Sequence, residues 1–168
     1  MFKFSSKENI KIIILSAISF FLSQCAEVCL NPGLKCVGCP YYNVSLTAYY
    51  PDYASDDSSD YLDVRGKKLK TLQDFLDGRD EYVTAAMDKN PEIPYGTQVC
   101  IPELNQHFKQ YIPIQVRDYS PDLEGEGHSS VDICVRSESD SYDFAVNRMA
   151  TLYIREDAKY NNNNDNDN

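Results

Sequence analysis

The sequence is poor in positive charge. Lys and Arg number 16 against 26 Asp and Glu, which gives a formal net charge of -10 and an isoelectric point near 4.6. Proteins that bind nucleic acid neutralise phosphates with Lys and Arg and release counterions. The composition therefore argues against a nucleic-acid partner, whereas an acidic surface suits a soluble secreted protein.

An apolar run long enough to cross a bilayer is also lacking. The run over residues 12–22 is shorter than the roughly 20 residues that a spanning helix needs, so no stable membrane span is expected. Lys3, Lys7 and Lys11 precede the run and polar or small residues follow it, which is the order of a secretory signal. We expect a signal peptide over residues 1–25 and a protein that is secreted, extracellular or cell-wall associated. An uncleaved anchor and lipidation of Cys25 are the alternatives.

Six cysteines in a secretory context predict disulfide bonds. A Cys-rich lead segment over residues 26–43 includes Cys36 and Cys39, whose spacing also occurs in metal and redox sites. No second pair matches that spacing, so we prefer a disulfide or a structural thiol, and we expect no cofactor and no metal. Cys100 and Cys134 lie in strand-like segments of the domain, and we expect a bond between them.

Six segments rich in β-branched and aromatic residues predict strands. They cover residues 41–50, 81–88, 97–101, 112–118, 131–135 and 151–154. Short strands joined by turn-rich links are typical of a small closed barrel. We therefore predict a mainly β protein, with one monomeric barrel domain over residues 44–156.

Two helical segments and a polar tail complete the expected organisation. Leu69, Leu72 and Leu76 share one face at helical spacing, which predicts a short helix over residues 67–76 that stops before Gly78. A further helical turn is expected at residues 141–147. The tail over residues 157–168 ends in a run of only Asn and Asp over residues 161–168 and is expected to be disordered.

Three aspartates at strand positions are the candidate functional residues. Asp88 follows one predicted strand, Asp118 ends another, and Asp132 lies inside Val131-Asp132-Ile133-Cys134-Val135. Strict alternation turns Val131 and Ile133 to the core and Asp132 to the opposite face. Asp132 is therefore expected to line a surface or a groove.

The order of these blocks resembles the 3D domain, which is named after three aspartates. The matching segments are 82–88, Ile-Pro-Tyr-Gly-Thr at 93–97, Val-Arg-Asp at 116–118, Val-Asp-Ile at 131–133 and 150–154. The resemblance implies a double-psi β-barrel over roughly residues 44–154. This barrel is found in the membrane-bound lytic transglycosylase A of bacteria and is similar to those of barwin-like endoglucanases and expansins.

The same resemblance implies that Asp132 is the catalytic carboxyl, with Asp118 and Asp88 as neighbours in the groove. To cleave a glycosidic bond, one carboxyl must keep its proton near neutral pH, and apolar flanks with a nearby carboxylate raise a pKa in that direction. The implied partner is a wall glycan such as peptidoglycan or chitin. A structural role, in which Asp118 and Asp132 brace barrel loops, is the alternative.

The family usually has a Gly-rich turn after its second aspartate, whereas this chain has a longer acidic loop over residues 119–128. That difference favours a noncatalytic polysaccharide binder or a protease inhibitor, and the 13 tyrosines offer rings that stack on sugars. Asp118, Ser120 and Asp122 faintly resemble a Ca²⁺ loop, although a loop without metal is preferred. His128 is a further candidate base or ligand beside Asp132, but a single loop histidine is more often simply exposed.

Overall fold

The computed structural model describes residues 32–90 and 92–155. The expected signal peptide over residues 1–25 and the tail over residues 157–168 lie outside the described residues. So does the first part of the lead segment, with Cys29. Within the described ranges, no helix combines the length and the apolar character that a membrane crossing requires.

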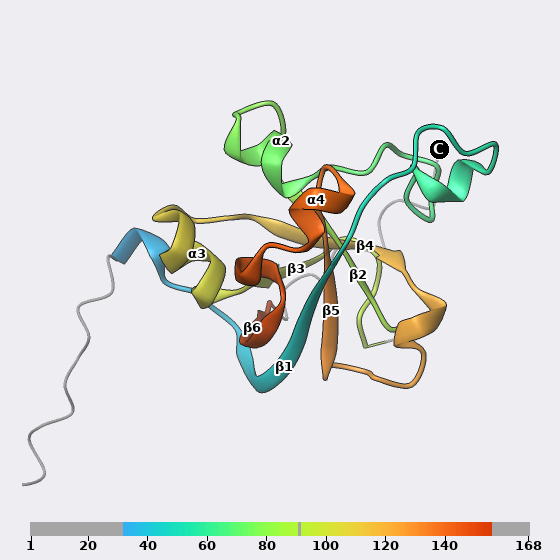
Figure 1. Ribbon diagram of the computed structural model, residues 1–168. Coiled ribbons are helices and arrows are strands. Elements are labelled where there is room, and N and C mark those ends of the chain that lie inside the picture. The colour runs from blue at the N-terminus through green and yellow to red at the C-terminus, as the bar shows by residue number, and fades with distance from the viewer. Residues whose placement is uncertain (1–31, 91, 156–168) are drawn as a thin grey trace, which may run out of the picture. The chain divides into compact units, whose positions relative to one another are not determined.

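Six strands form a closed barrel in the order β1-β5-β2-β4-β3-β6 (Figure 1). The strands are β1 (Cys39–Tyr49), β2 (Val83–Met87), β3 (Thr97–Cys100), β4 (Ile114–Tyr119), β5 (Ser130–Cys134) and β6 (Arg148–Ile154). Two pairs are parallel, β1 with β5 and β2 with β4, and the other pairs are antiparallel. Each strand overlaps a segment predicted from the sequence, so the prediction of a small, mainly β barrel is confirmed. The mixed pairing is compatible with a double-psi barrel.

The barrel interior is filled by the inward-facing residues of every strand. In β2, for example, Val83, Ala85 and Met87 belong to the buried cluster. Thr84 and Ala86 face outward and are nevertheless buried, because other segments cover that face. The segment before α2 is one of them, since the Thr84 amide donates to the Lys70 carbonyl over 2.8 Å. The Thr84 side chain in turn accepts a hydrogen bond from the Lys70 amide.

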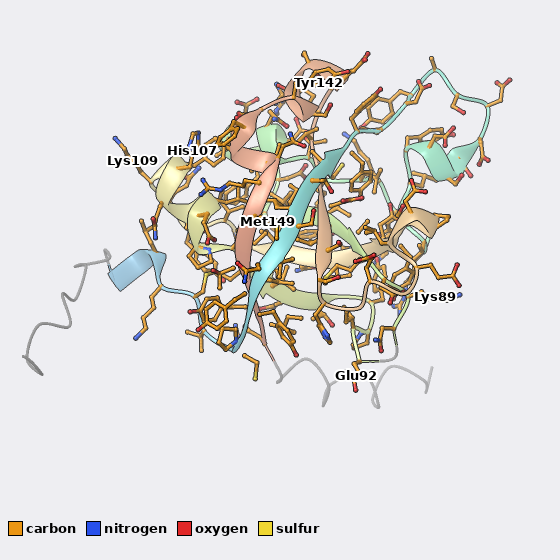
Figure 2. The ribbon with its side chains drawn as sticks, turned by 60° about the horizontal axis from the view of Figure 1, so that its bottom comes forward. Lys89, Glu92, His107, Lys109, Tyr142 and Met149 are labelled. Carbon is orange, nitrogen blue, oxygen red and sulfur yellow. A yellow bond between two sulfur atoms is a disulfide. The ribbon has the colours of Figure 1, made fainter. Side chains whose placement is uncertain are left out.

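Short helices pack around the barrel. They are α2 (Leu72–Leu76), α3 (Pro102–Phe108) and α4 (Glu138–Ser141), with the 3-10 turns η1 (Pro32–Leu34), η2 (Ser58–Asp60), η3 (Pro121–Leu123) and η4 (Phe144–Val146). Figure 2 shows His107 and Lys109 at the end of α3, and Met149 on β6, which α3 contacts. Lys109 has a φ of 56°, and this left-handed residue ends α3.

Helix α2 is shorter than predicted. Thr71 caps it by accepting a hydrogen bond from the Asp74 amide, so the helix begins at Leu72 rather than at Lys67. Lys68, which the prediction placed in the helix, instead forms a β-bridge with Leu62. Leucine spacing alone could not reveal this competing pairing.

The disulfide bond joins Cys36 to Cys100, and the predicted bond between Cys100 and Cys134 is wrong. The reason is the strand order, because β3 lies between β4 and β6 whereas β5 lies between β1 and β2. Cys134 is a buried free thiol. Cys100 lies close to Asn105 of α3, whose side chain also donates to the Leu34 carbonyl. The bond is consistent with an oxidising environment.

Candidate functional site

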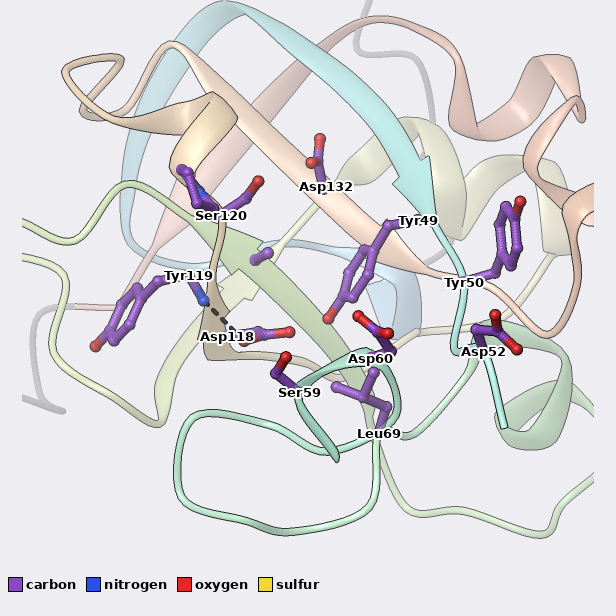
Figure 3. Close-up of a pocket in the computed structure, with 12 residues that line it drawn as sticks. Tyr49, Tyr50, Asp52, Ser59, Asp60, Leu69, Asp118, Tyr119, Ser120 and Asp132 are labelled. Carbon is purple, nitrogen blue, oxygen red and sulfur yellow. Dashed lines mark hydrogen bonds between the residues drawn. The ribbon is translucent and has the colours of Figure 1, made fainter. Parts of the chain in front are cut away.

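A pocket of about 450 Å³ opens on one side of the barrel (Figure 3). Its lining residues come from β1, β2, β4, β5 and the loops that follow β1 and β4. They are Tyr49, Tyr50, Asp52, Ser59, Asp60, Leu69, Ala86, Asp118, Tyr119, Ser120, Pro121 and Asp132. The wall therefore combines carboxylates with tyrosine rings.

Asp118 and Asp132 reach this pocket from either side of β2. Ala86 of β2 is in register with Asp118 on β4 and with Asp132 on β5. Two strand spacings separate the two aspartates, which is about 10 Å between their backbones. The small side chain of Ala86 leaves the space between them open.

A β-bulge in β4 turns Asp118 toward the pocket. Val116 is in register with Ala85, and Asp118 is in register with Ala86, so one extra residue, Arg117, lies between the two pairs. With regular alternation and no bulge, Asp118 would share the face of buried Val116, two residues earlier, and would point into the core. Bulges of this kind redirect side chains and often occur beside functional sites.

Asp132 is half-buried and carries a raised pKa. Burial is the main cause, and the negative charge of Asp122 adds to it. The Thr47 hydroxyl on β1 donates a hydrogen bond to Asp132 Oδ1 and opposes the shift. Asp132 therefore retains its proton to a higher pH than an ordinary aspartate.

Asp118 also has a raised pKa, again mainly because of burial. The Tyr119 amide donates to its Oδ1 over 3.0 Å, and Tyr49 also lowers the pKa. Asp63 raises it through charge repulsion. More groups favour the charged form at Asp118 than at Asp132.

The Tyr49 hydroxyl is the unusual polar group of the pocket. Figure 3 shows its ring directed into the pocket toward Asp118. Its oxygen is buried, yet among the described residues no group satisfies it with a well-aligned hydrogen bond. Burial, followed by the neighbouring Cys134 and Asp118, raises the pKa of Tyr49 well above its usual value. The hydroxyl therefore stays protonated and able to donate.

Asp88 does not line this pocket. It is buried directly after β2, and its Oδ2 accepts a hydrogen bond from the Gly127 amide over 2.9 Å. This contact braces the loop between β4 and β5. The structure thus brings Asp118 and Asp132 together and places Asp88 elsewhere.

His128 also lies away from the two pocket aspartates. Its ring stacks on Tyr41 with centroids 4.2 Å apart and an interplanar angle of 9°. Both residues line a different, smaller pocket. Among residues 32–90 and 92–155, no three His, Cys, Asp or Glu side chains are grouped as metal ligands, and this includes the acidic loop after Asp118.

The remaining pocket residues carry little local signal in the sequence. Asp52 and Asp60 belong to a polar segment typical of a solvated loop, and both are exposed. In the sequence, nothing distinguishes Tyr49 and Tyr50 from the other tyrosines of an expected tyrosine-rich surface. Their place beside Asp132 depends on the pairing of β1 with β5, in which Thr47 is in register with Asp132. That pairing joins segments far apart in the chain.

No protein-family model matches the sequence, and no curated protein matches it either. The fold and the pocket therefore carry the functional argument. They define a small closed β-barrel with two half-buried carboxyl groups in a tyrosine-lined pocket.

Proposed function

We propose that this chain is a secreted, monomeric protein that binds a cell-wall or extracellular polysaccharide and cleaves its glycosidic bonds. The observation that carries the proposal is the placement of Asp118 and Asp132 in one pocket, each with a pKa raised by burial. Glycosidic cleavage requires a carboxyl that stays protonated and a second carboxyl nearby. The resemblance to the 3D domain implies these two residues together with Asp88, which lies outside the pocket.

Asp132 is proposed as the general acid. It donates its proton to the glycosidic oxygen while the bond between that oxygen and the anomeric carbon breaks. The resulting carboxylate then takes a proton from a hydroxyl group whose oxygen bonds to the anomeric carbon. If that hydroxyl belongs to the same sugar, the product is an anhydro sugar, and if it belongs to water, the reaction is hydrolysis.

Asp118 is proposed to remain charged. The Tyr119 amide and the nearby Tyr49 both favour its carboxylate form. A negative charge opposite Asp132 would stabilise the positive charge that develops on the sugar ring. The tyrosine rings in the wall offer stacking surfaces for sugar units.

A noncatalytic polysaccharide binder or inhibitor-like protein is the second candidate. Two observations favour it. The Thr47 hydroxyl bound to Asp132 stabilises the charged form, which a general acid does not need. The Asp88 carboxylate accepts a hydrogen bond from the Gly127 amide and does not line the pocket.

Product analysis separates the two candidates. Purified protein is incubated with peptidoglycan, chitin and β-glucan, and soluble products are identified by mass spectrometry. We expect products from the unmodified protein and a loss of about 100-fold or more in the Asp132→Asn variant. A Glu92→Gln variant, changed outside the pocket, is the control. Binding without products from any variant would leave only the noncatalytic candidate.

A further inference from the structure

The pocket is acidic beyond the two proposed catalytic residues. Asp52 and Asp60 add two carboxylates to its rim, and none of the lining residues is Lys, Arg or His. Within the described part of the chain, none of the four pocket aspartates takes part in an ion pair. The site therefore holds negative charge that the described residues do not neutralise.

The arginine side chains beside the pocket make their contacts outside it. Arg65 lies over the Tyr95 ring, with its guanidinium carbon 4.0 Å from the ring centroid. Arg117 pairs with Asp63 over 3.1 Å and also lies over the rings of Tyr82 and Tyr95. These arginines brace the loop beside the pocket and leave its aspartates without a counter-charge.

The Tyr49 hydroxyl supplies a second, independent sign of a ligand. It is buried, points into the pocket and has no well-aligned hydrogen-bond partner among the described residues. A buried polar group without a partner costs free energy. A ligand hydroxyl or amine in the pocket would supply the partner.

We infer that this pocket is selective for amino-sugar chains that carry free, positively charged amines, such as deacetylated chitin. The inference rests on the proposed polysaccharide-binding function of the same site and names the class of glycan. The amines match the carboxylates of Asp52, Asp60 and Asp118. The sugar rings match the walls of Tyr49, Tyr50 and Tyr119. A neutral N-acetylated chain offers the same rings without the charge.

Calorimetric titration tests this selectivity. The full protein is titrated with β-1,4-linked glucosamine chains, N-acetylglucosamine chains of equal length and oligolysine of equal charge, at a mildly acidic pH. We expect the glucosamine chain to bind at least about tenfold more tightly than the other two. Added salt should weaken its binding more than that of the neutral chain.

Three variants assign the effect to the pocket. Asp52→Asn combined with Asp60→Asn should weaken glucosamine binding by about tenfold, at roughly two- to fivefold for each carboxylate, and should leave N-acetylglucosamine binding unchanged. Glu81→Gln combined with Glu92→Gln removes the same charge from exposed positions outside this pocket and should change neither. Tyr49→Phe should weaken both sugars by about fivefold to tenfold without unfolding the protein, because no described residue pairs well with its hydroxyl.

The outcomes distinguish this inference from the proposed function. Equal or tighter binding of the neutral chain overturns the selectivity for amines and leaves saccharide binding intact. Oligolysine that binds as tightly as the glucosamine chain overturns it in favour of a basic peptide. If no saccharide binds, the proposed function fails together with the inference.

Discussion

The most heavily hydrogen-bonded carboxylate in the described part of the molecule lies next to the pocket rather than in it. Asp63 is buried and accepts hydrogen bonds from the Tyr95 hydroxyl at 2.7 Å and from Arg117 at 3.1 Å. It also accepts from the backbone amides of Arg65 and Lys67. Burial alone would raise the pKa of Asp63, but the hydrogen bonds outweigh it and the pKa is lowered. This carboxylate therefore holds the loop that follows β1 against the barrel.

Replacing Asp63 by Asn should lower stability by about 2 kcal/mol at pH 7, because charge-assisted hydrogen bonds are lost from a buried site. A lowered pKa stabilises the fold above the ordinary aspartate value of about 3.9, and this stabilisation is lost as the pH falls through the native value. The difference in the free energy of unfolding between the unmodified protein and the Asp63→Asn variant should therefore become smaller in acid. Urea denaturation at neutral and strongly acidic pH measures it. Exposed Asp56, changed to Asn, is the control. An Asp63 difference that stays constant with pH contradicts the argument.

Asp118 should behave in the opposite way. Its pKa is raised, so the ionised carboxyl opposes folding once the pH exceeds the ordinary aspartate value. Asp118→Asn keeps the acceptor for the Tyr119 amide and should stabilise the protein at pH 7 by about 0.5 kcal/mol, a small gain because solvent screens part of the charge. The gain should vanish when acid protonates the aspartate in both folded and unfolded states. Thermal melts across this pH range measure it, and a variant that melts lower at pH 7 rules the interpretation out.

At the scale of elements, the start of β1 depends on a close backbone approach. Gly38 has a φ of 131°, and a Cβ built there would lie 2.2 Å from the Ile154 carbonyl oxygen of β6. Gly66 also has a positive φ, of 71°, but a Cβ at that position would have nothing within 4 Å. Comparing alanine substitutions at the two glycines therefore distinguishes the cost of a steric clash from the cost of a positive φ.

Gly38→Ala should destabilise the protein by about 2–3 kcal/mol, since the clash adds to the strain of a left-handed residue. Gly66→Ala should cost only about 1 kcal/mol, from the backbone term alone. Chemical denaturation of both variants gives the comparison. Equal losses would mean that the approach of residue 38 to β6 does not constrain the barrel.

Local sequence patterns are enough to predict where the strands lie in the chain, but not which strands pair with each other. Alternating β-branched residues in segments such as residues 131–135 reflect one buried face, which is a local property. The bulge at Arg117 and the late start of α2 arise from pairing with distant segments or with a bridge outside the helix. For the same reason, the grouping of Asp118 with Asp132 can be expected only through the family resemblance.

At the scale of the whole molecule, the disulfide bond ties the lead segment to the barrel. Cys36 and Cys100 are 64 residues apart, and a cross-link over a loop of that length restricts the unfolded chain strongly. Its pairing depends on the order of strands around the barrel, which no local pattern in the sequence encodes.

Replacing Cys36 and Cys100 together by Ser should lower the free energy of unfolding by about 4 kcal/mol. Urea titration without reductant measures the loss. The control is Cys134→Ala, which removes a thiol that forms no disulfide in the structure and so should not abolish a reductant-sensitive transition. If Cys134→Ala removed the sensitivity to reductant instead, the pairing would be contradicted.

The closed order of the barrel also governs when the protein can fold during synthesis. Of the strands in the described residues, β1 emerges from the ribosome first, but its neighbours are β5 and β6, which end at Cys134 and Ile154. Until those last strands are made, β1 has an unpaired edge on both sides. The barrel therefore cannot close until nearly the whole domain has been synthesised.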